Sequence, residues 1–183
     1  MKNYLGIAGL ITPALLVAGY LITSTDMTAS ERGDSAQIST LLADAKAEAV
    51  QLKEDSSDME SFAKSKLSWE SYAGKVEMIK GHVNNTGKLL ARLQEQEHAG
   101  SQWQQTAIRR IEPLLKELAA NTEATINYLN ENRTKIHFAG FKDYVKANYE
   151  LATDLEALIR DFVNYDDAKD KFERLGRKLE VTD

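Results

Sequence analysis

The sequence contains no cysteine and only two prolines in 183 residues. The absence of cysteine excludes disulfide bonds, thiolate zinc sites, iron–sulfur clusters and covalently attached c-type haem. Proline removes a backbone donor and clashes inside helices, so its scarcity favours long helices. Runs that alternate apolar and polar residues, as half-buried strands do, are also lacking. These absences favour an all-α protein that depends on its apolar core for stability.

Strong charge of one sign is lacking too. The net charge is −5, with 43% hydrophobic and 28% charged residues, which is typical of a globular domain. Phosphate binding needs a basic surface, so we expect no nucleic-acid partner. The chain has only three histidines, and it shows no catalytic triad, glycine-rich phosphate loop or inward pair of carboxylates. The sequence therefore predicts a protein that is not an enzyme and that holds no metal or cofactor.

The N-terminus carries an uncharged apolar run, residues 4–22, directly after Lys2. It resembles a secretory signal peptide, with residues 1–29 removed and 30–34 left as a tether. It also suits an uncleaved membrane anchor, because nineteen helical residues span about 28 Å. Both interpretations place the rest of the chain outside the cytoplasm, periplasmic or secreted, and membrane contact is expected only through residues 4–22 if they are retained.

A seven-residue apolar repeat organises the remainder of the chain. Its clearest part contains two rows: Trp69, Val76, Val83 and Leu90, and Tyr72, Ile79, Thr86 and Leu93. Such a repeat is typical of coiled coils and of helices packed at a shallow angle. We predict a four-helix bundle over residues 35–183, with helices at about 35–65, 69–98, 102–133 and 141–179. Short connections favour an antiparallel up-down-up-down order, with Asp34 as the first N-cap and an overhanging fourth helix.

The fourth predicted helix carries its own seven-residue row: Tyr144, Leu151, Leu158, Tyr165, Phe172 and Leu179. Threonines interrupt the apolar rows of the second and third helices at positions 86, 122 and 125. Such a polar layer can fix the register of a bundle, with each hydroxyl bonded to its own helix at i−4, or it can line a ligand pocket. We favour the register.

Two further groups of residues have both structural and functional interpretations. Met78 and His82 lie one turn apart and are both haem-ligand types, but axial ligands usually come from opposing helices, so we expect packing for Met78 and a boundary or surface position for His82. Ile136, His137 and Phe138 occupy the loop before the fourth helix. They form either a partner-contact site or a plug over the end of the bundle.

Three stretches, residues 68–90, 103–132 and 143–159, resemble a group of exported bacterial helical-bundle proteins to which no function is assigned. The resemblance implies an exported bundle and supplies no activity or site residues. We therefore expect a structural or envelope protein-interaction module that contacts an unidentified protein partner or itself. The alternative is a carrier that binds a small ligand or cofactor at the polar layer.

Overall fold

The computed structural model describes residues 33–65, 67–134 and 139–179, and these are helical apart from short connections. The helices are α1 (Ala36–Phe62), α2 (Trp69–Gln96), the short 3-10 helix η1 (Glu97–Ala99), α3 (Gln102–Glu131) and α4 (Ala139–Leu179). These ranges contain no strand, which confirms the all-helical prediction for them. None of the helices in these ranges is both long and apolar enough to cross a membrane. The expected targeting segment, residues 1–29, lies outside the described residues.

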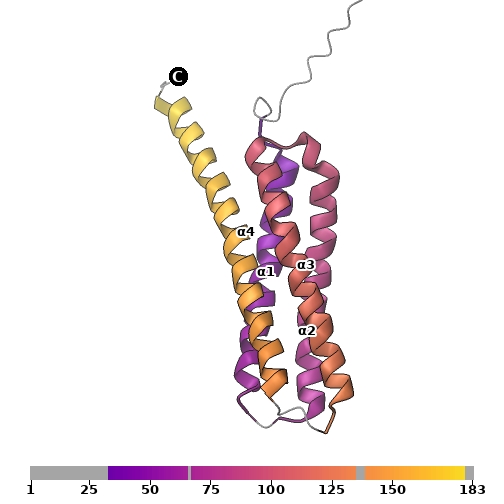
Figure 1. Cartoon of the computed structure of the whole chain (residues 1–183). Helices are drawn as coiled ribbons and strands as arrows, with labels where there is room; N and C mark the ends of the chain where they lie inside the picture. The colour runs from indigo at the N-terminus through magenta and orange to yellow at the C-terminus, as the bar shows by residue number, and fades with distance from the viewer. Residues whose placement is uncertain (1–32, 66, 135–138, 180–183) are drawn as a thin grey trace, which may run out of the picture.

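The four long helices pack as a bundle in which each contacts two others (Figure 1). α1 and α3 each lie against α2 and α4. At one end, the Trp69 indole donates to the carbonyl of Leu129 across 2.9 Å and joins the start of α2 to the end of α3. At the other end, Asp34, Ser101 and Lys169 meet, and we call this end the Asp34 pole.

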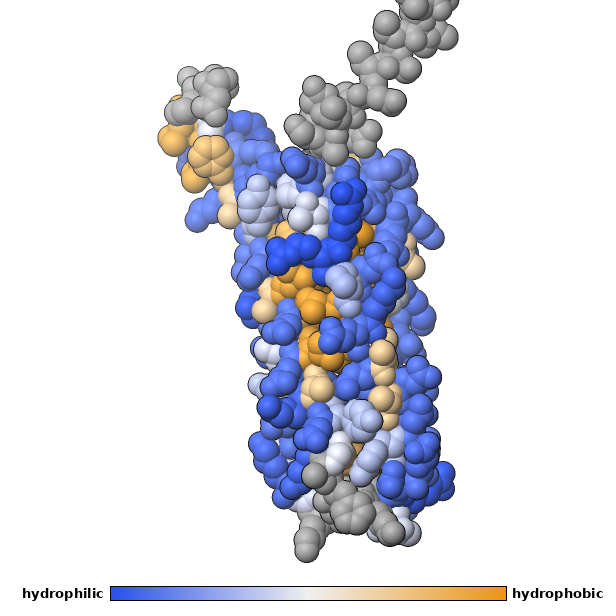
Figure 2. Space-filling model, viewed as in Figure 1, coloured by the Kyte–Doolittle hydropathy of each residue, from blue (hydrophilic) through white to orange (hydrophobic). Residues whose placement is uncertain are grey.

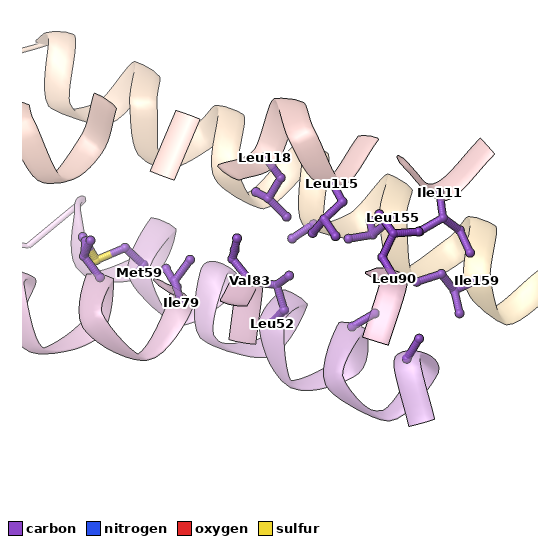
Figure 3. Close-up of a cluster of buried hydrophobic side chains, with 14 of the residues drawn as sticks. Leu52, Met59, Ile79, Val83, Leu90, Ile111, Leu115, Leu118, Leu155 and Ile159 are labelled. Carbon is purple, nitrogen blue, oxygen red and sulfur yellow. The ribbon is translucent and has the colours of Figure 1, made fainter. Parts of the chain in front are cut away.

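Apolar rows spaced by seven residues on α1, α2 and α3 form the core. Leu52, Ile79 and Leu118 are fully buried, and Figure 3 shows side chains from all four helices pointing toward one another there. Fully burying one such side chain contributes about 1.5–3 kcal/mol. Trp69 is the exception among the residues of the two predicted rows of α2: it lies at the edge of the core and is only partly buried. The seven-residue repeat therefore identifies the inward faces of these three helices.

The helix starts follow the sequence signals with one correction. Ser68 and Ser35 cap α2 and α1, and Ser101 with Gln104 completes a capping box at α3. The prediction of Asp34 as the first cap is wrong, since the Ser35 hydroxyl accepts from the backbone of Ile38 and Asp34 bonds to other helices. At Gly100, an added Cβ would lie 2.7 Å from Cδ1 of Ile38, so this turn packs tightly against α1.

The row predicted for the fourth helix is not its core face. The buried row of α4 consists of Phe141, Val145, Asn148, Ala152, Leu155 and Ile159. The predicted row lies beside it, partly buried from Tyr144 to Leu158 and exposed from Tyr165 onward. The predicted overhang is confirmed, because α4 extends past the other helices at the Asp34 pole (Figure 1).

Candidate interaction surface

The far half of α4 carries large apolar side chains with little cover. The exposed fractions are 52% for Tyr165, 72% for Phe172, 46% for Leu175 and 66% for Leu179. Together with Leu158 and Ala168 they occupy positions spaced by three, four or seven residues, so they lie on one side of the helix. We call this set of six residues the α4 stripe. Lys169 bonds to Asp34 at the pole, and residues 170–179 beyond it are called the overhang.

The stripe leads into a groove between α3 and α4. One cavity of about 250 Å³ is lined by Trp103, Arg110, Leu158, Asp161, Phe162 and Tyr165. A second, of about 580 Å³, shares Arg110, Leu158 and Asp161 with it. Figure 2 shows an apolar patch along this groove, edged by hydrophilic side chains, and a separate apolar group at the tip of α4. The groove and the apolar tip thus lie on the one side of α4 that the stripe follows, with Ala168 between them.

Aromatic contacts hold the walls of the groove. The Trp103 ring meets the Tyr165 ring edge to face, with centroids 5.3 Å apart. The Arg110 guanidinium lies 5.7 Å from the Phe162 ring centroid, within cation–π range. α3 continues unbroken through Pro113, which lines the larger cavity. Since α3 begins at Gln102, α4 residues beyond Tyr165 have no part of α3 beside them.

A buried polar network fixes α4 at the Asp34 pole. One oxygen of Asp34 accepts from the Ser101 hydroxyl at 2.5 Å and from Nε1 of Trp103 at 2.6 Å. Its other oxygen accepts from Nζ of Lys169. Beside it, the fully buried Gln104 amide accepts from the backbone of Ser35 and donates to its carbonyl. The network therefore ties the starts of α1 and α3 to α4 at the base of the overhang.

Charge at this pole shifts three pKa values. Burial disfavours ionised Asp34, but hydrogen bonds from Lys169, Ser101 and Trp103 outweigh it, so the pKa of Asp34 lies below its ordinary 3.8. The bond to Asp34 raises the pKa of Lys169 in spite of burial. Burial, together with the nearby negative charge of Asp170, raises the pKa of Asp166 although Ser39 hydrogen-bonds to it. Asp34 and Lys169 thus favour each other's charged forms, whereas the surroundings of Asp166 disfavour its anion.

The predicted polar layer is present, but it includes a residue of α4 that was not predicted. Thr86, Thr122 and Thr125 each donate to a carbonyl four residues earlier, as predicted. The contact across helices comes from Asn148 of α4, whose amide donates to Thr125 at 2.9 Å and accepts from Thr122 at 3.0 Å. Ser56 of α1 is buried, and its hydroxyl has no hydrogen-bond partner among the described residues. The layer therefore joins α3 to α4 and satisfies most of its own polar groups.

His82 lies at the boundary of α1 and α2, as predicted. Its Nδ1 is 2.8 Å from a carboxylate oxygen of Glu48, and its Nε2 is 3.4 Å from one of Asp55. Lys75 bonds to the same acidic face at Asp58. Met78 is 49% exposed, so the packing predicted for it is wrong. Among the described residues no group of three or more acidic, histidine or cysteine side chains could hold a metal.

The predicted contact residues Ile136, His137 and Phe138 lie outside the described residues. Searches against protein-family models, curated proteins and solved structures returned no significant match. The groove and the α4 stripe were not predicted from the sequence, because the seven-residue row of the fourth helix was interpreted as a core row. One signal was available: the predicted fourth helix is longer than its partners, so part of its row had to lack a neighbour.

Proposed function

We propose that the chain is an exported, noncatalytic bundle of four antiparallel up-down-up-down helices that acts by contact with a protein, as a structural or interaction module of the cell envelope. The observation that carries this proposal is the apolar α3–α4 groove together with the exposed apolar side chains of the α4 stripe, which share one side of α4. Single exposed apolar residues are ordinary, but several large ones on one side of a helix, beside an apolar groove with a hydrophilic rim, are typical of interaction sites. The contact site is thus the groove and stripe.

The proposed location outside the cytoplasm is supported by residues 4–22 in the sequence. Mass spectrometry of the N-terminus of the protein made in cells decides how it is held there. A chain that begins at Ser30 is released by cleavage, whereas one that retains Lys2 is anchored. A retained segment would lead into α1 at the Asp34 pole, the pole from which the overhang projects.

In-cell photocrosslinking tests the contact. A photoreactive phenylalanine replaces Phe172, which is exposed and lies on the stripe; the matched control replaces Arg174, which is exposed on the other side of the helix. We expect protein adducts from position 172 that are at least about tenfold stronger than from position 174, since interface cores exclude water and hold their contacts closely. Equal or absent labelling at the two positions would contradict the proposal.

The alternative function, a carrier of a small ligand or cofactor, would use the polar layer. The observation that favours it is the buried hydroxyl of Ser56 on α1, which has no hydrogen-bond partner in the part of the chain that the structure describes. However, Thr122, Thr125 and Asn148 already hydrogen-bond to one another, and a ligand would have to replace these bonds. Thermal-shift measurements with haem, lipids and metals test the carrier, and stabilisation by one of them that Ser56→Ala abolishes would favour it.

A further inference from the structure

We infer that the partner of the α4 stripe is a second copy of this chain, paired antiparallel through the overhang. This inference rests on the proposed function, because it names the occupant of the same surface. The first argument is that the groove and the overhang lie on one helix. A two-fold axis across the overhang places the overhang of each copy at the groove of the other, so one contact covers both apolar surfaces.

The second argument is the distribution of charge along α4. Residues 161–170 contain four aspartates and one lysine, a net charge of −3. Residues 171–179 contain four basic residues and one glutamate, a net charge of +3. Antiparallel pairing sets the acidic half of one copy beside the basic half of the other, whereas parallel pairing sets like charges together. Electrostatic complementarity of this kind selects orientation and suppresses wrong pairings.

The third argument is the fit of side chains. The seam of a heptad consists of two positions that alternate at spacings of three and four residues. In an antiparallel pair of helices, one of these positions on one helix faces the other position on its partner. Setting Phe172 of one copy against Ala168 of the other joins a large side chain to a small one. The same register sets Tyr165 against Leu175, and it brings Leu179 to the mouth of the groove beside Asp161. The overhang projects beyond the pole (Figure 1), which leaves room for this pairing.

Cysteine crosslinking tests the register directly, because the chain has no cysteine of its own. Full-length Tyr165→Cys and Leu175→Cys chains are oxidised separately and as a mixture. In the antiparallel pair, residue 165 of one chain lies level with residue 175 of the second chain. The two residues numbered 165 lie about 15 Å apart along the helix axis, and so do the two numbered 175. A disulfide needs Cα atoms within about 7 Å, so we expect at least about tenfold more linked dimer from the mixture. Arg174→Cys, on the other side of the helix, is the control and should not link.

Light scattering on the full chain and on Phe172→Asp gives an independent measurement. We expect the mass of two chains for the wild type and one for the variant, with the same helical circular dichroism and unfolding midpoint in dilute solution. Strong linking of each single-cysteine chain with itself would indicate parallel pairing and overturn the register.

A monomeric wild type without linking would overturn the inference. If position 172 then still labels another protein in cells, the interaction function stands and only the second copy is excluded. If Phe172→Asp instead weakens binding to vesicles of anionic phospholipid, the stripe binds lipid and both the second copy and a protein partner are excluded.

Discussion

The two halves of α4 share one seven-residue repeat but differ in what covers it. In the first half, Leu151 and Leu158 lie partly buried beside a core row that includes Leu155, which is fully buried. In the second half, Phe172 and Leu179 continue the repeat with most of their surface in water. The same residue pattern therefore stabilises the bundle in one half and presents a contact surface in the other, and only the length of the neighbouring helices separates the two roles.

The boundary between the halves is the Asp34 pole. There the side chain of Trp103 contacts Tyr165, and that of Asp34 bonds to Lys169. A helix that continued without an anchor would fray, since isolated short helices are marginal in water. The ion pair thus allows α4 to project an apolar face rather than to end with the bundle.

Truncation of leucine on the two sides of the boundary gives the largest expected contrast. Leu155→Ala should lower the free energy of unfolding by about 2–5 kcal/mol, because it leaves a cavity in the core. Leu175→Ala, a change of the same chemistry on the overhang, should alter it by less than about 0.5 kcal/mol in dilute solution. Urea unfolding of both variants measures the difference, and a similar loss for both would show that the overhang packs within the monomer.

Asparagine offers a second matched pair. Asn148→Ala removes the amide that joins Thr122 to Thr125 and should cost about 2 kcal/mol, through lost hydrogen bonds and a small cavity. Asn164→Ala, at an exposed position of the same helix, should change stability by less than about 0.5 kcal/mol. The comparison is again made by urea unfolding, and a loss below about 0.5 kcal/mol for Asn148→Ala would mean that the layer contributes no stability.

The sequence was sufficient to predict the helices and three of the four inward faces, because periodicity directly reports which side of a helix is buried. It was insufficient for α4, which carries two apolar rows. The row with the large residues Tyr165 and Phe172 looked stronger than the row that contains Asn148 and Ala152. Burial depends on the neighbouring helices, so size and repetition alone could not choose between the rows.

The hydrogen-bond network around Asp34 could not be predicted from the sequence either. Asp34 precedes Ser35, and both are good N-cap residues, so local preference could not distinguish them. The decisive partners, Ser101 and Lys169, are 67 and 135 positions away in the chain. Such long-range hydrogen bonds follow from the packing of the helices, and no local pattern indicates them.

Asp34→Asn should loosen the boundary and cost about 1.5 kcal/mol at pH 7, because a charged acceptor is replaced by a neutral one. The pKa of Asp34 is lowered on folding, so its stabilisation is present above the unfolded value of about 3.8 and is lost as the pH falls through the folded value. The raised pKa of Lys169 means that the stabilisation is also lost at high pH, as the pH rises through its folded pKa.

Stability measured from pH 2 to 8 checks this prediction. The difference between wild type and Asp34→Asn should begin to shrink below about pH 4, where the unfolded carboxylate takes up a proton, and should be lost once the pH falls below the lower folded pKa. Asp167→Asn, at an exposed position of α4, serves as the control for removing one negative charge. A constant difference across the acid range would mean that the Asp34 charge does not hold α4.

The smallest expected difference in stability is between alanine substitutions at Tyr165 and at Phe172. Tyr165→Ala removes an edge-to-face contact with Trp103 and should cost about 1 kcal/mol, the range measured for aromatic pairs. Phe172→Ala, one heptad further on, removes a larger exposed area and should cost less than about 0.5 kcal/mol when the protein is dilute. At high concentration the cost of Phe172→Ala should rise well above this value, because a dimer joined at Phe172 adds stability that depends on concentration. Unfolding curves at two concentrations about a hundredfold apart separate the two contributions, and a concentration-independent loss for Phe172→Ala would place that side chain in contacts within its own chain.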